Sequence, residues 1–120
     1  MSYTIEYSVE CLPEFMPIEG NASAIDPETD AQIAAHIKNE LEAGNDWAWC
    51  AVRVKAAAFD DAGEQIAYGE DYLGGCSYSS ETAFTACPYY EDMKTIAREE
   101  CEAEILRIAT AICEYEEENK

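Results

Sequence analysis

The chain has 120 residues, in which 26 acidic side chains against 7 lysine and arginine side chains give a formal net charge of -19. Because 48% of the residues are hydrophobic, the charge does not indicate a disordered chain, and a folded core is expected. A surface of this sign repels nucleic acids and anionic membranes. We therefore exclude direct binding to either and expect a strongly basic protein partner.

The N-terminal third predicts one strand and one helix joined by an irregular connection. Apolar side chains at alternate positions of residues 3–11 are typical of a half-buried strand. Residues 12–24 carry prolines and a glycine and predict a loop. Asp26-Pro27 is a typical helix start, and apolar residues at helical spacing continue until Gly44 ends the helix. We expect this helix, Asp26 to Ala43, to cover one face of a sheet.

Residues 46–78 predict a long β-hairpin with its turn at residues 60–63, and the rest of the chain is arranged around it. One face of its first strand carries only narrow apolar side chains, which suits a helix packed close above it. These residues are Ala48, Cys50, Val52, Val54, Ala56 and Ala58. The return strand is expected at Glu64 to Tyr72, after which the Gly-Gly pair at residues 74–75 turns the chain out of the sheet.

A long C-terminal helix is expected from Pro88 to about Glu117. Its apolar stripe runs through Met93, Ala97, Cys101, Ile105, Ile108, Ile112 and Tyr115. Roughly thirty helical residues span about 45 Å, which exceeds a small domain, so the last turns should project or bend. Residues 1–120 are therefore predicted to form a single α+β domain. Its antiparallel sheet of about three strands is packed by two main helices, the C-terminal one long.

Acidic side chains are densest along this C-terminal helix, which carries ten of them. Their mean axial spacing, about 4.5 Å, is comparable to the spacing of about 3.4 Å between phosphates on one DNA strand. Two interpretations are open: a surface that occupies a basic nucleic-acid cleft, or a solvated helix face with an acidic tail. For the acidic tail alone we favour the second interpretation. For the whole chain we favour the first, because the acidic excess extends over every segment. The residues expected to bind the partner are Glu99, Glu100, Glu102, Glu104, Asp60, Asp61, Glu70, Asp71, Trp47 and Trp49.

Catalytic and metal-binding patterns are absent from the sequence. His36 is the sole histidine and lies off the apolar stripe of its helix, and no phosphate-binding or nucleophile-elbow motif occurs. No C-x-x-C pair occurs, and an acidic group such as Asp60, Asp61 and Glu64 would bind a cation only loosely. A thiol enzyme built on Cys76 would need an electropositive neighbourhood that this chain lacks. We therefore expect no enzyme, no catalytic residue, no metal and no cofactor.

The cysteines indicate a reducing compartment. No apolar run of about 18 residues and no signal peptide is recognisable, so neither a membrane span nor export is expected. Three disulfide bonds are the alternative if the protein is exported. We expect reduced thiols that behave as small core side chains at Cys11, Cys50, Cys76, Cys87, Cys101 and Cys113.

The segments NDWAWC, GEDYLGGCSY and YYEDM give the chain a resemblance to small acidic accessory proteins of bacteriophages and mobile elements. In length and charge the whole chain is similar to anti-CRISPR and anti-restriction proteins that mimic DNA. The resemblance lies in size and composition, without a diagnostic motif, so it assigns no role to a numbered residue. It implies a non-enzymatic inhibitor in the host cytoplasm that blocks the basic DNA-binding surface of a CRISPR-Cas complex or a restriction nuclease.

The alternative function comes from a different class of protein. Trp47 and Trp49 would share a partly buried sheet face with Arg53 and Lys55, and large aromatic rings are favoured anchors at interfaces. A phage structural or regulatory module would bind a protein partner through that face, with the charge serving only solubility. Pairing of two copies through the long helix is also left open.

Overall fold

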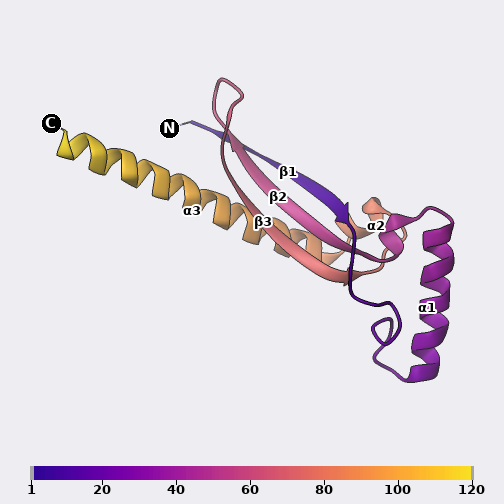
Figure 1. Ribbon diagram of the computed structural model, residues 1–120. Helices are drawn as coiled ribbons and strands as arrows, with labels where there is room; N and C mark the ends of the chain where they lie inside the picture. The colour runs from indigo at the N-terminus through magenta and orange to yellow at the C-terminus, as the bar shows by residue number, and fades with distance from the viewer. Residues whose placement is uncertain (1, 120) are drawn as a thin grey trace. The chain divides into compact units, whose positions relative to one another are not determined.

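The computed structural model describes residues 2–119 as an α+β fold with a three-stranded sheet (Figure 1). In chain order its elements are β1 (Thr4–Leu12), α1 (Pro27–Glu42), η1 (Asp46–Ala48), β2 (Cys50–Phe59), β3 (Gln65–Cys76), α2 (Glu81–Thr85) and α3 (Pro88–Glu118). The strand order is β1-β2-β3. The predicted antiparallel sheet and long C-terminal helix are therefore confirmed. Among the described residues, no helix combines the length and the apolar character needed to cross a bilayer.

The chain divides into two compact units, and every strand of the sheet contributes residues to both. Unit 1 comprises Met1–Ser8, Val54–Asp71 and Glu91–Lys120. Unit 2 comprises Val9–Arg53 and Tyr72–Tyr90. The assignment of residues 1–120 to a single domain stays a prediction.

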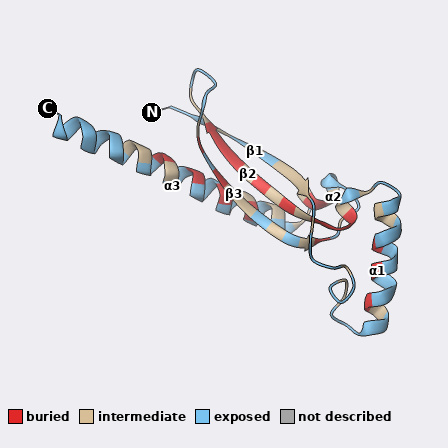
Figure 2. Ribbon diagram, in the orientation of Figure 1, coloured by how far each residue is buried: buried red, intermediate tan, exposed pale blue. Residues whose placement is uncertain are grey.

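The core of unit 1 is made of small side chains on the sheet and of the buried stripe of α3. Ala56 and Ala58 of β2 are fully buried, as predicted from the narrow apolar face of this strand. Figure 2 shows buried residues along β2 and on one side of α3. Because alanine projects little, the helix lies close to the sheet. The buried cluster consists of Ala56, Ala58, Ala67, Ala97, Cys101 and Ile105.

Gly69 of β3 marks a point where the backbone of α3 comes very close to the sheet. A Cβ atom at this position would lie 2.1 Å from the Ala97 carbonyl oxygen and 2.6 Å from the Cys101 backbone nitrogen. Both distances are far shorter than a van der Waals contact, which is about 3.5 Å or more between heavy atoms. The φ angle of Gly69 is not positive, so glycine is required here for space and not for an unusual backbone conformation.

The last turns of α3 are exposed on all sides. Every residue from 111 to 119 is exposed, whereas the buried residues of this helix lie between Met93 and Ile105. The apolar stripe nevertheless continues into these turns with Ile112 and Tyr115, whose side chains are 47% and 66% exposed. The predicted projection of the helix end is confirmed for unit 1.

Two predicted boundaries of the hairpin are wrong. Residues 46–48 form η1 and not strand, because the Asn45 side chain accepts a hydrogen bond from the Trp47 N–H at 3.2 Å and starts a helical turn. β3 does not end at Tyr72 but continues to Cys76. Gly75 has a φ of 62°, and a glycine absorbs this left-handed conformation inside the strand without turning the chain out of the sheet.

α1 begins where the sequence predicts, but its buried side meets a different neighbour. The Asp26 carboxylate accepts a hydrogen bond from the Thr29 N–H at 2.6 Å and caps the helix. Ile37 forms a buried cluster with Ala48 and Trp49, so α1 packs against η1. The apolar stripe of this helix predicts instead that it covers a face of the sheet. The connection between α1 and η1 is only a few residues long, which keeps these two elements adjacent.

Asp30 holds the connection that precedes α1. Its carboxylate accepts hydrogen bonds from the backbone N–H groups of Gly20 at 2.7 Å, Ser23 at 3.0 Å and Ala22 at 2.8 Å. These donors, led by Gly20, stabilise the ionised carboxylate and hold the pKa of Asp30 below its ordinary value. A buried acidic side chain in this chain is therefore a structural anchor.

We expect Gly69→Ala to lower the free energy of unfolding by about 1–3 kcal/mol, because the added methyl group must push the α3 backbone away from β3. Urea unfolding followed by circular dichroism measures the change. Gly74→Ala is the matched control on the same strand, because the nearest atom to its added Cβ would be Glu14 Oε2 at 3.5 Å. An equal loss in both variants would contradict the close approach of α3.

We expect Asp30→Asn to lower the urea midpoint at neutral pH and to make stability less sensitive to acid. The folded pKa of Asp30 lies below the ordinary value of 3.8, so this carboxylate stabilises the fold above pH 3.8. Its contribution is lost as pH falls through the folded pKa. Urea midpoints measured from neutral pH to below 3.8 test this, with Glu28→Gln as an exposed control in the same helical turn. An acid profile of Asp30→Asn identical to that of the unmodified protein would refute the anchoring role.

Candidate acidic binding surface

α3 positions the largest group of carboxylates in the chain. Its buried residues are confined to the stripe that begins at Met93 and ends at Ile105, so the acidic side chains occupy the rest of the helix circumference. All of them are exposed except Glu104, which is half-buried. They are Glu91, Asp92, Glu99, Glu100, Glu102, Glu104, Glu114, Glu116, Glu117 and Glu118.

Ion pairs within the described part of α3 neutralise only a part of this charge. They are Glu91–Lys94, Glu102–Arg98 and Glu104–Arg107. In the last pair, Arg107 Nε donates to Glu104 at 3.0 Å, and this hydrogen bond lowers the pKa of the Glu104 carboxyl. Pairs at the surface of a helix contribute little stability, so the main consequence of the arrangement is a helix with a large net negative charge.

The predicted partner-binding glutamates of α3, which are Glu99, Glu100, Glu102 and Glu104, point in different directions. Each residue rotates the helix by about 100°, so Glu100 and Glu104, one turn apart, lie on the same side. Glu99 lies opposite the buried stripe, and Glu102 lies on the other flank of that stripe, beside Arg98. Only Glu100 and Glu104 face β3.

A groove of about 530 Å³ lies between β3 and α3, within unit 1. Consecutive residues of a strand point to opposite faces, and both sets line the groove, so it runs along the edge of β3 and not across a face. Among the described residues β2 is the only strand paired with β3, so this edge of the sheet is open. The lining consists of Gln65, Ile66, Ala67, Tyr68 and Glu70 on the strand, and of Glu100 and Glu104 on the helix.

The groove has an aromatic side and an apolar neighbour. Lys55 Nζ lies 4.8 Å from the centroid of the Tyr68 ring, a cation–π contact that holds the half-exposed ring in place. Ile66 also belongs to an adjoining hollow of about 300 Å³ whose lining is entirely isoleucine. That hollow is lined by Ile66, Ile105, Ile108 and Ile112.

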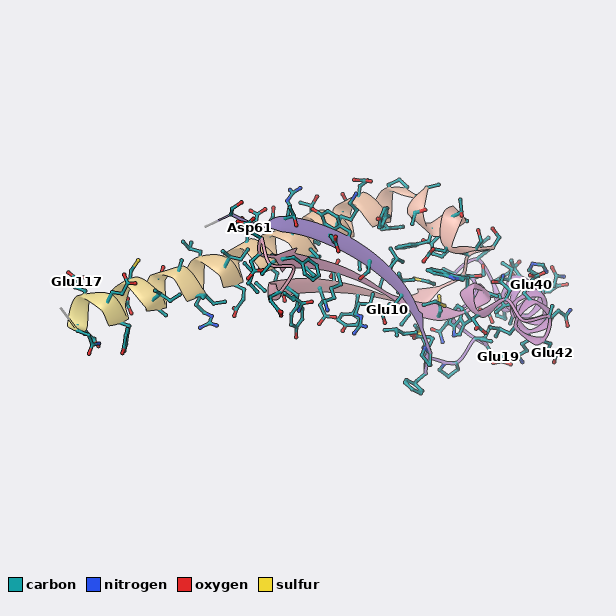
Figure 3. The ribbon with its side chains drawn as sticks, turned by 90° about the horizontal axis from the view of Figure 1, so that it is seen from above. Glu10, Glu19, Glu40, Glu42, Asp61 and Glu117 are labelled. Carbon is teal, nitrogen blue, oxygen red and sulfur yellow. The ribbon has the colours of Figure 1, made fainter. Side chains whose placement is uncertain are left out.

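The other predicted carboxylates of unit 1 differ in their surroundings. Asp60 Oδ1 accepts hydrogen bonds of 2.9 Å from two backbone N–H groups of the hairpin turn, so its main role is to shape that turn. Asp61 is exposed at the tip of the turn, as Figure 3 shows. Glu70 and Asp71 are both half-buried on β3, and Glu70 lines the groove.

The two tryptophans proposed as partner anchors lie in the interior of unit 2 or at its margin. Trp49 is 8% exposed, and its indole N–H donates to the Met16 carbonyl at 2.9 Å. Trp47 is half-buried and stacks on Phe84 with ring centroids 5.8 Å apart. Because η1 replaces the start of the predicted strand, the alternation that would place Trp47 on one face with Arg53 does not apply. Because Trp49 is buried, it is not available as a surface anchor.

Unit 2 carries carboxylates of its own on β1, on the connection after it and on α1 (Figure 3). Glu10 pairs with Arg53, and this hydrogen bond raises the pKa of the guanidinium above its already high value. Glu19 pairs with Lys38. The residues labelled in this part of the figure are Glu10, Glu19, Glu40 and Glu42.

The buried thiols are poor nucleophiles. Cys50, Cys76 and Cys101 are buried, and burial raises the pKa of each, that of Cys76 to about 11. A contact with Cys11 raises the pKa of Cys50 further. At neutral pH these thiols are therefore protonated.

Among residues 2–119, no three or more histidine, cysteine or acidic side chains are arranged to hold a metal ion.

Comparison of the chain with protein-family models, with curated proteins and with solved structures finds no match. The functional interpretation therefore rests on the side chains and the groove of this structure.

The groove itself is the feature that sequence patterns did not reveal. Glu70 is far from Glu100 and Glu104 in the chain and lines the same groove only because α3 packs beside β3. One sequence signal could have predicted the close packing that forms the groove. Ala67 and Gly69 occupy alternate positions of the return strand, and such small residues leave room for a helix backbone on that face.

At neutral pH we expect iodoacetamide to modify the exposed Cys113 first, whereas Cys50, Cys76 and Cys101 react only after denaturation, because burial keeps those thiols protonated. Peptide mapping by mass spectrometry before and after addition of urea measures the order. Rapid alkylation of Cys76 in the folded protein would contradict this expectation and favour the thiol-enzyme interpretation.

Proposed function

We propose that this protein is a non-enzymatic inhibitor of a host defence complex, either a CRISPR-Cas effector or a restriction nuclease. It binds the basic nucleic-acid-binding surface of that complex and blocks DNA binding by mimicking the charge of DNA. The partner is a protein, and no cofactor takes part.

One observation carries this proposal: the carboxylates of α3 outnumber the basic side chains of the same helix by ten to three. A continuous helix of 31 residues spans about 46 Å and holds these charges at defined positions. A disordered acidic tail of the same composition would have to lose conformational entropy on binding, and the helix has already lost it.

The chemistry of inhibition is an exchange of phosphates for carboxylates. Arginine and lysine side chains that bind DNA phosphates also form charge-assisted hydrogen bonds with carboxylates. Arginine does so in a bidentate geometry. Exposed glutamates such as Glu99, Glu100 and Glu102 would meet such residues and exclude the DNA backbone. Tyr68 would add a contact that depends less on salt concentration.

A second candidate function is a module that binds its partner through an aromatic sheet face, with the charge serving solubility. The observation that favours it is Tyr68, which is 48% exposed beside Lys55. Tyr68→Ala would abolish binding of such a module, whereas it would weaken a charge-driven inhibitor only modestly.

We expect reversal of Glu99, Glu100, Glu102 and Glu104 to lysine to abolish inhibition. The measurement is displacement of fluorescent duplex DNA from purified CRISPR effector complexes and restriction nucleases, with DNA cleavage as a second readout. For the unmodified protein, displacement should weaken by about a hundredfold or more between roughly 50 and 200 mM salt, as expected when several ion pairs form.

The control is a variant with the same change in net charge at another position, with Glu114, Glu116, Glu117 and Glu118 reversed to lysine. If local carboxylates make the contact, this control keeps more of the inhibition than the first variant does. Circular dichroism must show that both variants fold. A folded first variant that inhibits as well as the unmodified protein, or the absence of DNA displacement across the whole panel at low salt, would sink the proposal.

A further inference from the structure

We propose that the open edge of β3 is a binding site for an extended basic segment of a protein, with lysine or arginine at alternate positions, which adds to the sheet as a fourth strand. This inference goes beyond the proposed function, because it holds for any partner that carries such a segment, whether or not that partner binds DNA.

The first ground is the open edge itself. β3 is an edge strand of 12 residues whose pairing within residues 2–119 is with β2 alone. The outward backbone N–H and C=O groups of such a strand are a template for another strand. The groove opens beside residues 65–68 and Glu70 and is bordered by α3 on one side, whereas Gly69 between them is buried against the α3 backbone. An edge strand next to a helix is the arrangement in which peptides bind by strand addition.

The second ground is a match of spacing. Glu100 and Glu104 lie four residues apart on α3, which places them about 6 Å apart along the helix axis. Side chains at positions i and i+2 of an extended peptide project to one side about 6.6–6.8 Å apart. Two basic residues at alternate positions therefore reach both carboxylates at once. Glu104 also accepts a hydrogen bond from Arg107 Nε at 3.0 Å, and this hydrogen bond lowers the pKa of its carboxyl.

The side chains between the basic ones meet an aromatic ring. In an added strand they point to the opposite face of the sheet, where the ring of Tyr68 is half-exposed beside Lys55. A β-branched or other apolar side chain fits against this ring, whereas a second positive charge would be repelled by Lys55. The preferred segment therefore alternates basic with apolar residues, and a block of basic residues is disfavoured.

The charge of the groove selects against the two other occupants of an open edge. A second copy of this chain would bring a net charge of -19 beside another, which opposes pairing of two β3 edges. A nucleic acid would bring phosphates against Glu70, Glu100 and Glu104. A basic polypeptide replaces both repulsions with attraction.

The experiment uses the full-length protein and a fluorescent peptide of about eight residues that alternates lysine with valine, a length that covers the groove. Its comparator has the same composition, with the lysines and valines in two separate blocks. Fluorescence anisotropy should give the alternating peptide an affinity at least about tenfold higher, a difference of about 1.4 kcal/mol. Amide hydrogen exchange should slow at alternate residues of β3 between Gln65 and Glu70 when the alternating peptide binds.

Two versions of the alternating peptide carry N-methyl groups on one or the other set of alternate residues. Strand addition requires that only one set donates hydrogen bonds to β3, so one version should lose binding and the other should keep it. Glu100→Gln with Glu104→Gln should weaken the alternating peptide by about tenfold or more. The control, Asp92→Asn with Glu99→Gln, has the same change in charge on the outward side of α3 and should weaken it by less than about threefold.

Equal affinities for the two unmethylated peptides, unchanged exchange at β3, or equal binding of both methylated peptides would each overturn the proposal. A concentration-dependent dimer whose formation protects the same β3 amides would overturn it in favour of a second copy. The DNA-displacement assay with the Glu100 and Glu104 variant separates the two proposals. If the variant loses peptide binding but still displaces DNA, the strand-addition site is separate from the inhibition, and the charge-mimicry proposal is retained. If the unmodified protein binds the peptide but does not displace DNA, the proposed function is wrong and only the peptide-binding proposal is retained.

Discussion

The close contact between α3 and the sheet in unit 1 is the constraint on which the surface of this protein depends. The contact is possible because alanine and glycine leave room for helix backbone at Ala56, Ala58 and Gly69. A helix held this close presents its flanks to the strand beside it. The side chains of Glu100 and Glu104 therefore form a wall next to β3.

The same contact sorts the carboxylates of α3 into classes that a count of charges does not distinguish. Glu100 and Glu104 face a groove with backbone and aromatic groups opposite them, whereas Glu99 faces away from the sheet. Charges that face outward act together as a field, which steers a basic partner and is weakened by salt. Charges that line a groove act at short range and select the geometry of what binds. The polyanion proposal uses the first property, and the peptide proposal uses the second.

Unit 2 illustrates how polar and aromatic groups serve the fold in a chain with so much charge. Asp30 binds three backbone N–H groups of the preceding connection, and the indole of Trp49 binds a backbone carbonyl. These hydrogen bonds satisfy the Asp30 carboxylate and the Trp49 indole N–H, both of which are buried. Residue type alone therefore does not separate an interface from a core.

Periodicity alone determined the strand at residues 3–11, the narrow buried face of β2, and the length and buried stripe of α3, because those patterns depend on neighbours in the chain. The turn of the hairpin was also predictable, since Asp and Gly suit it locally. Only the tertiary structure decided that α1 packs on η1, that β3 continues to Cys76, and that Trp49 is buried. It also decided which acidic residues meet, because Glu70 and Glu104 become neighbours only through the packing of α3 beside β3. Local pattern specifies which side of an element is buried, but not which element covers it.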